Sequence, residues 1–117
     1  MTPREEAHLR ILKIIEKNPE ISQRALAKDL GVSLGMINFQ LNALVDKGLV
    51  KIESFRRTGD RLNKIVYLLT PEGIRNRVQL TRDYLARKEA EYLALKSVLK
   101  ALRKENIDLV PERDRQP

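Results

Sequence analysis

The chain has 117 residues, enough for one domain and an extension, and its formal net charge of +7 favours an acidic partner. It contains no cysteine, which excludes a disulfide framework, a thiol nucleophile and a thiolate metal site. Its apolar runs are too short to cross a membrane, and its first ten residues, MTPREEAHLR, are too charged for a signal peptide. We therefore expect a soluble, cytoplasmic protein.

The first predicted element is a helix that ends at Asn18-Pro19. Thr2 is placed to cap it, Pro3 suits the first helical position, and Glu5 completes a capping box. His8 is the only histidine in the sequence, and no ligand-type residues are grouped with it. We expect it to be a structural histidine, on the surface or half-buried. The apolar stripe of this helix consists of Ala7, Ile11, Leu12 and Ile15.

Residues 21–48 predict a helix-turn-helix. Ser22 can cap a helix that ends at Gly31, where a left-handed residue is favoured. Ser33 repeats the capping signal for a second helix, which Gly48 ends. The small side chain of Ala27 permits the close helix crossing that the motif requires. The apolar positions at helical spacing are Leu26, Ala27 and Leu30 in the first helix, and Ile37, Leu41, Leu44 and Val45 in the second.

After Gly48 the period of the pattern changes from that of a helix to that of a strand. Leu49–Phe55 alternates apolar and polar residues, and Ile65–Leu69 is a second β-rich run. The intervening stretch, Arg56–Lys64, is centred on a Gly-Asp turn. Three helices followed by a hairpin predict a mainly α fold with a small β-hairpin (α+β), a winged helix-turn-helix domain over residues 1–70.

A long helix is predicted over residues 71–105, because a threonine cap and a proline start it and nothing breaks it before about Asn106. At 1.5 Å per residue it is roughly 50 Å long, more than so small a domain can cover, although part of its stripe could pack on that domain. Its heptad seam predicts a coiled-coil-like homodimer, in which Thr81 and Lys88 are imperfections that can set the register. Residues 106–117 are expected to form a disordered tail. The predicted dimer contacts are Val78, Leu85, Tyr92, Leu95, Leu99 and Leu102.

Basic residues are concentrated between positions 47 and 82, where nine stand against three acidic residues. A solvated basic face is the alternative, but the position beside a helix-turn-helix favours phosphate binding. Arg57 and Arg61, at the tip of the predicted wing, are candidates for the minor groove or for the DNA backbone. The predicted DNA contacts in this segment are Lys47, Arg56, Arg57, Arg61 and Lys64.

The second helix of the motif is predicted to read base edges from its N-terminal half. Asn38 and Asn42 can each offer adenine a paired donor and acceptor. Phe39 suits contact with thymine methyl groups, unless it is buried against another helix or the wing. Ser33 and the free amides after it suit a phosphate. The predicted DNA-binding residues of this helix and its cap are Ser33, Leu34, Gly35, Asn38, Phe39 and Asn42.

The stretch ALAKDLGVSLGMINFQLNALVDKGLV resembles the helix-turn-helix and following strand of the MarR-type winged-helix repressors. With the arginine-rich wing, YLLTPEGI and one long helix, the likeness extends from about Glu5 to Arg103 and is closest to MarR-family regulators associated with bacterial exopolysaccharide genes. The resemblance implies a homodimeric, sequence-specific binder of double-stranded DNA, a repressor in its typical form. MarR proteins build their dimer from helices at both ends and often hold an aromatic ligand there. Here only one long helix follows the wing, so the resemblance does not by itself predict a pocket for an effector ligand.

An enzyme is not predicted, because the sequence has no glycine-rich phosphate loop, metal-ligand cluster or Ser/His/Asp arrangement. No cofactor, metal site or membrane contact is expected. The alternative from another class is a winged helix used as a protein-docking module and tethered by a coiled coil. That function would favour an apolar or acidic outer face on the second helix, whereas the sequence places asparagines and basic neighbours there.

Overall fold

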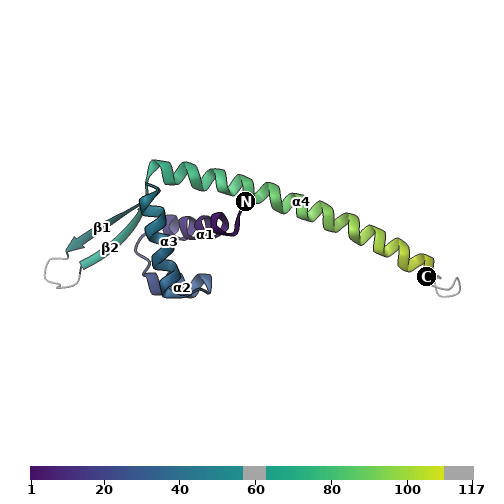
Figure 1. Cartoon of the computed structure of the whole chain (residues 1–117), viewed down its shortest axis with the longest axis horizontal. Coiled ribbons are helices and arrows are strands. Elements are labelled where there is room, and N and C mark those ends of the chain that lie inside the picture. Colours follow the sequence, from purple (N-terminus) through teal and green to yellow (C-terminus); the bar gives the residue numbers. More distant parts are fainter. Residues whose placement is uncertain (57–62, 110–117) are drawn as a thin grey trace. The chain divides into compact units, whose positions relative to one another are not determined.

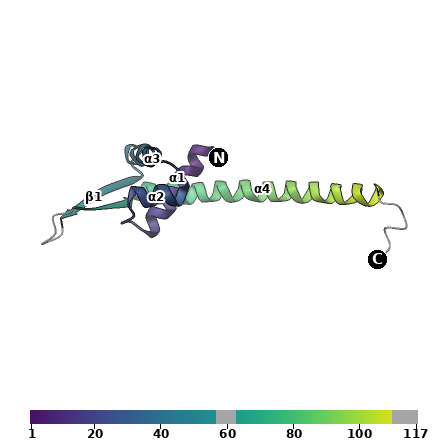
Figure 2. The ribbon, with the colours of Figure 1, turned by 90° about the horizontal axis from the view of Figure 1, so that it is seen from below.

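The computed structural model describes residues 1–56 and 63–109. Their contacts form two units, Met1–Asp83 and the chain from Tyr84 onward, and each unit is described by itself. The described part holds four helices and a two-stranded antiparallel hairpin, as the sequence predicted (Figure 1, Figure 2). The elements are α1 (Pro3–Lys17), α2 (Gln23–Leu30), α3 (Leu34–Asp46), β1 (Val50–Arg56), β2 (Asn63–Leu69) and α4 (Pro71–Leu109).

The predicted helix caps of α1, α2 and α3 are all present. The Thr2 hydroxyl accepts from the Glu5 amide at 3.1 Å, and the Glu5 carboxylate accepts from the Thr2 amide at 3.3 Å. These hydrogen bonds favour the charged carboxylate, so the pKa of Glu5 is lowered. Ser22 and Ser33 each accept an amide hydrogen bond at 3.1 Å from the residue three positions later. Caps of this kind satisfy donors that a helix leaves unpaired, which fixes where each helix begins.

The turn between α2 and α3 depends on Gly31. Its φ of 67° is left-handed, a conformation that costs glycine little and other residues more. The chain then returns a hydrogen bond from the Val32 amide to the Ala27 carbonyl at 3.0 Å, as a left-handed helix end commonly does. The two helices of the motif are thereby joined by a turn of only three residues.

The core of the first unit lies where α1, α2 and α3 meet. Its largest fully buried side chains are Ile11, Leu12, Ile15, Leu26, Ile37, Leu41 and Leu44. The predicted position of His8, on the surface or half-buried, was wrong, because this side chain is only 4% exposed and joins the buried face of α1. Apolar periodicity does not count histidine as a core residue, so the sequence pattern placed it too far outward.

The hairpin pairs β1 with β2 in a register that sets Val50 opposite Leu69 and Ile52 opposite Tyr67. Both strands differ slightly from their predicted limits, since β1 starts one residue later and β2 two residues earlier. Tyr67 is buried, and its amide donates to the Pro19 carbonyl at 2.9 Å. This bond ties the hairpin to the loop between α1 and α2. The predicted Gly-Asp turn lies outside the described residues.

Helix α4 begins against the end of α3, at a point where the backbones approach closely. Thr70 caps it, accepting from the Gly73 amide at 3.0 Å, while its hydroxyl donates to the Gly48 carbonyl. A Cβ on Gly73 would lie 2.0 Å from the Leu49 carbonyl oxygen. No other residue fits there without a backbone shift, so Gly73 has a packing role that the sequence analysis did not identify.

The second unit is helical through Leu109, four residues past the predicted end at residue 105. From Lys88 to Asp108 every side chain of α4 is exposed in the single chain. The exposed large apolar residues on this stretch include the predicted seam positions Tyr92, Leu95, Leu99 and Leu102, and Leu85 just before it is exposed as well. The predicted dimer contact Val78 lies in the first unit and is half-buried. No described helix combines the length and the apolar character that a membrane span requires. Residues 110–117 of the predicted tail lie outside the described residues.

Candidate nucleic-acid interface

Helix α3 has one buried face and one exposed face. Ile37, Leu41 and Leu44 point into the core, and each is at most 1% exposed. The predicted base-reading residues lie on the opposite side, where Phe39 is 58% exposed. Burial of Phe39 against another helix or the wing therefore does not occur in the described part of the chain. The other exposed positions of this face are Leu34, Gly35, Asn38 and Asn42.

A chain of side-chain hydrogen bonds connects this exposed face with the hairpin. The Gln23 amide donates to the Tyr67 hydroxyl at 3.2 Å. The Gln23 carbonyl oxygen accepts from the Asn38 amide at 3.4 Å, and the Asn38 carbonyl oxygen accepts from the Asn42 amide at 3.1 Å. We call these four residues the polar ladder. It orients both asparagines and leaves the Asn42 carbonyl oxygen as an outward acceptor at its end.

The start of α3 offers donors to an anion. The Ser33 oxygen accepts from the Met36 amide and so caps the helix. Its hydroxyl hydrogen can still be donated. Leu34 and Gly35 supply the first two amides of the helix, and the described contacts give neither a backbone acceptor. A phosphate oxygen would satisfy these groups and would be favoured by the helix dipole.

Several of the basic side chains between positions 47 and 82 form ion pairs within the chain. Lys64 pairs with Glu20, and Arg77 pairs with Glu16, so both cations are drawn toward α1 and the loop after it. Lys51 and Arg75 pair with neighbouring carboxylates. Lys47, at the end of α3, is exposed and has no ionic partner among the described residues. The predicted contacts at Arg57 and Arg61, and the side chain of Arg56, lie outside the described residues.

Two potential DNA contacts were missed by the sequence analysis. Gln23 reaches α3 from the first turn of α2, and the adjacent Arg24 is exposed without an ionic partner in the described chain. A residue of the first helix of the motif can contact the DNA backbone when that helix crosses it. The position of Arg24, two residues after the Ser22 cap, was the available signal. The pairing of Gln23 with Asn38 and Tyr67 had no local signal.

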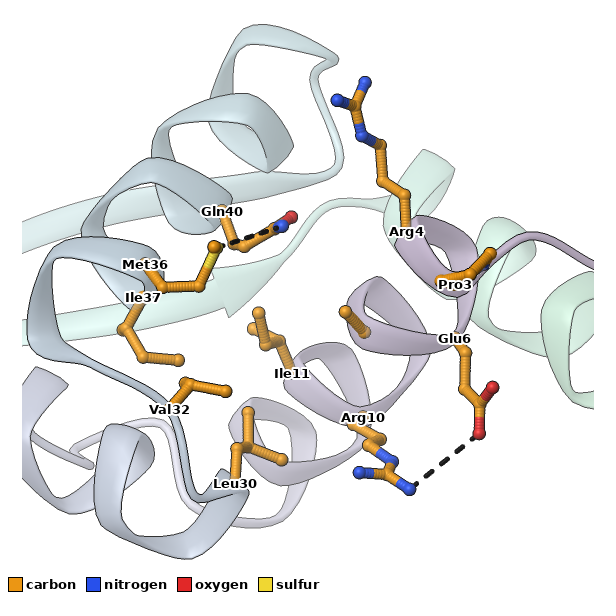
Figure 3. A pocket seen from close by; sticks show the side chains of 11 residues that line it. Pro3, Arg4, Glu6, Arg10, Ile11, Leu30, Val32, Met36, Ile37 and Gln40 are labelled. Carbon is orange, nitrogen blue, oxygen red and sulfur yellow. Dashed lines mark hydrogen bonds and ion pairs between the residues drawn. The ribbon is translucent and has the colours of Figure 1, made fainter.

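A groove of about 580 Å³ runs between the N-terminal half of α1 and the start of α3 (Figure 3). Apolar side chains of Ile11, Leu30 and Val32 converge on it, and Met36 and Ile37 close one side. Its rim is charged, with an ion pair between Arg10 and Glu6 at 3.8 Å. The groove can accept an apolar side chain or a small amphipathic molecule.

His8 lies on the helix that lines this groove, beside Gln40 of α3. Burial lowers the pKa of His8, and the neighbouring Gln40 side chain opposes part of that shift. The neutral imidazole is therefore the favoured form at neutral pH. Among the described residues no three His, Asp or Glu side chains are grouped so that they could hold a metal ion.

Residues 4–51, which comprise α1, the helix-turn-helix and the start of the hairpin, match the family model for winged helix-turn-helix DNA-binding. Three helices occupy the matched stretch, and the antiparallel hairpin that begins at its end completes the arrangement of a winged helix. The domain is a winged helix-turn-helix. In its terms α3 is the recognition helix and the hairpin is the wing.

Solved structures share the fold of this chain, and MarR-family regulators are among them. Streptococcus pneumoniae FabT, solved in complex with DNA, is 24% identical with a TM-score of 0.54, over 94% of this chain and 78% of its own. PcaV of Streptomyces coelicolor, solved with its natural ligand, is 24% identical with a TM-score of 0.56, over 93% and 76%. A MarR-family protein of Mycobacterium tuberculosis, solved with p-aminosalicylic acid, is 22% identical with a TM-score of 0.52, over 82% and 76%.

The predicted resemblance to MarR regulators is thus confirmed at the level of the fold. At identities below 25% these comparisons show a shared fold. The DNA and the ligands were bound by those proteins. A search of curated protein sequences finds no significant match.

Proposed function

We propose that this chain is a MarR-type transcription regulator that binds double-stranded DNA sequence-specifically as a homodimer. The observation that carries the proposal is the exposed face of α3 in a winged helix-turn-helix, with Asn38 and Asn42 oriented by the polar ladder. Amide side chains on a recognition helix can pair with the N6 and N7 edge of adenine. Phe39, exposed between them, suits a thymine methyl group.

Phosphate contacts would hold the recognition helix in register. The groups proposed for these contacts are Ser33 and the first amides at the start of α3, the exposed Lys47 at its end, and the exposed Arg24 on α2. The basic residues of the wing tip, Arg56, Arg57 and Arg61, are proposed to contact the backbone or the minor groove, whereas Lys64 pairs with Glu20. Contacts of this kind supply affinity without sequence information, whereas the asparagines supply discrimination.

The second unit is proposed to join two chains. Its seam side chains are exposed in the single chain, and Tyr92, Leu95 and Leu102 are each more than half exposed. Burying each against a second copy would contribute on the order of 1.5–3 kcal/mol. Two recognition helices related by symmetry read an inverted repeat, which a single domain cannot do. Repression, and a role at exopolysaccharide genes, are proposed from the sequence resemblance.

Fluorescence anisotropy with duplex DNA tests the proposal directly. The probe is the promoter of the chain's own operon, and the control is a duplex of equal length and composition in scrambled order. We expect the promoter to bind at least about 10³-fold more tightly at physiological salt, the lower end for specific regulators. Equal binding of both duplexes would refute sequence-specific regulation.

The alternative of a protein-docking module is favoured by one observation, the apolar groove between α1 and α3. Val32 and Met36, which line it, are 41% and 46% exposed, so apolar surface is present beside the recognition helix. A docking module would bind neither duplex, even at low salt where phosphate contacts are strongest. The same anisotropy titration, repeated at 50 mM salt, therefore separates the two functions.

A further inference from the structure

The exposed stretch of α4 carries a seam that a second copy has to match in a particular direction. The helix itself is continuous from Tyr84 to Leu109, and nothing within the described chain covers its apolar side chains. Leu85, Tyr92 and Leu99 occupy one set of heptad core positions, seven residues apart. The other set consists of Lys88, Leu95 and Leu102.

Lys88 distinguishes the two possible directions. In a parallel pair with both chains in register, each core residue meets its own copy, so Lys88 would face Lys88 of the partner subunit inside the seam. In an antiparallel pair, residues of one set face residues of the other. Lys88 can then lie along a leucine, with its aliphatic stem on apolar surface and its ammonium group at the edge. Glu91 already accepts from that ammonium group at 3.2 Å within the same helix.

The charges beside the seam point the same way. Glu89 and Lys96 flank the core on one side, and neither has an ionic partner within the described chain. They are seven residues apart, too far to pair along their own helix, since such pairs need a spacing of three or four. Glu91, on the other side, pairs with Arg87 at 3.4 Å as well as with Lys88. The unpaired charges are therefore the ones that an antiparallel partner would meet.

We infer that two copies of this chain pair through α4 as an antiparallel coiled coil whose centre lies between Leu93 and Ala94. The inference rests on the proposed homodimer and gives its direction and register. Leu85 packs on Leu102 of the partner subunit, and Lys88 packs on Leu99 of the partner subunit. Tyr92 packs on Leu95 of the partner subunit at the centre. Glu89 meets Lys96 of the partner subunit, and symmetry makes two such ion pairs.

Neighbouring antiparallel registers are less favourable. A shift of one heptad toward the N-terminus sets Glu89 against Glu89 of the partner subunit and Glu91 against Glu91 of the partner subunit. A shift toward the C-terminus sets Lys96 against Lys96 of the partner subunit and Glu91 against Glu105 of the partner subunit. In the inferred register the like-charge contact beside the seam is that of Arg82 with Arg103 of the partner subunit. That contact lies outside the outermost apolar layer, where both groups are exposed and salt screens them.

Cysteine cross-linking tests the direction, and the natural chain contributes no background because it has no cysteine. Leu85→Cys and Leu102→Cys are each oxidised alone and as an equilibrated mixture, with one chain carrying a size tag. We expect the mixture to give the mixed disulfide and neither variant alone to cross-link. Lys100→Cys, outside the seam, is the control and should not cross-link. Efficient disulfides in each single variant would establish a parallel pair and overturn the inference while leaving the homodimer in place.

Charge reversal tests the register in solution. Glu89→Lys or Lys96→Glu alone should raise the dimer dissociation constant several-fold, as exposed ion pairs do, and the double variant should restore it. The matched control combines Glu91→Lys with Lys96→Glu, a pair that would meet only in a parallel coil. Restoration by the control and not by the first pair would overturn the inference. A wild-type chain that sediments as a monomer would overturn both the inference and the proposed homodimer.

Discussion

The asparagines proposed to read DNA are connected by side-chain hydrogen bonds to a buried residue of the domain. Tyr67 is buried in the hairpin, and its hydroxyl fixes Gln23, which in turn fixes Asn38. An amide whose carbonyl and amino groups are both engaged cannot rotate freely between its two orientations. The asparagines thus lose less conformational freedom when they meet a base. We therefore expect the polar ladder to affect DNA specificity more than the stability of the domain.

Asn38→Ala and Asn42→Ala should each reduce the discrimination between operator and scrambled DNA by about 1–3 kcal/mol, because a paired base contact is lost. Affinity for scrambled DNA should change little. Gln23→Ala removes the support without touching the asparagines, so a smaller loss of discrimination is expected with the fold intact. Anisotropy titrations against both duplexes measure these effects. An equal loss on the two duplexes would assign the asparagines to backbone positioning.

The buried His8 makes the stability of the first unit depend on pH. Its lowered pKa means that the unfolded chain, with an ordinary value near 6.5, binds a proton more readily than the folded chain. The contribution of neutral His8 is complete above about pH 6.5 and is lost as the pH falls through that value toward the folded pKa. Urea unfolding should therefore give a lower free energy at pH 5.5 than at pH 7.5. His8→Gln should flatten this difference, and an unchanged slope would show that other groups cause it.

At the scale of the elements, the backbones are closely packed at the junction of α3, the hairpin and α4, where Gly73 has no space for a side chain. Gly48, Leu49 and Thr70 are joined there by backbone and side-chain hydrogen bonds, and Gly73 packs directly against the Leu49 carbonyl. A helix start fixed at both its cap and its first turn orients the beginning of α4 on its own domain. Substitutions at this junction should therefore lower the free energy of unfolding and leave the exposed DNA-binding side chains in place.

Gly73→Ala should lower the free energy of unfolding of the first unit by about 1–3 kcal/mol, since its Cβ must displace backbone atoms. Gly35→Ala is the matched control. A Cβ there meets nothing within 4 Å, and alanine in a helix is favoured over glycine by about 0.5–1 kcal/mol. Chemical denaturation of the two variants should give changes of opposite sign. Similar values for both would mean that the Gly73 contact relaxes freely.

For the whole molecule, the proposed function depends on two chains acting together. The first unit has its own core in α1, α2, α3 and the hairpin, so its folding does not require the seam. Operator binding does require the seam if the two half-sites are read by symmetry. Stability and specific binding can therefore be separated by mutation.

Leu95→Glu combined with Leu99→Glu places charges at exposed seam positions in both chains and should produce monomers. Operator affinity should collapse because only one half-site can be bound, while affinity for scrambled DNA should largely persist. Sedimentation and anisotropy measure the two effects, and the unfolding of the first unit serves as the control for folding. A double variant that remains a dimer with full operator affinity would exclude the seam as the interface.

Local chemistry determined most of what the sequence could predict. The Thr2, Ser22 and Ser33 caps, the left-handed Gly31 and the heptad period each depend on residues within about one or two turns of each other. The exposed face of α3 followed from the same periodicity. These features require no knowledge of which distant segments meet, and the four helices and the hairpin appeared close to their predicted limits.

Only the tertiary structure decided the features that join distant residues. The burial of His8, the contact of Gly73 with Leu49 and the link from Gln23 to Tyr67 have no signal in the local pattern. The same is true of Lys64, whose charge the sequence assigned to DNA and which the fold pairs with Glu20. Gln23 and Tyr67 are 44 residues apart, and only the packing of the hairpin against α1 and the loop after it brings them within hydrogen-bonding distance.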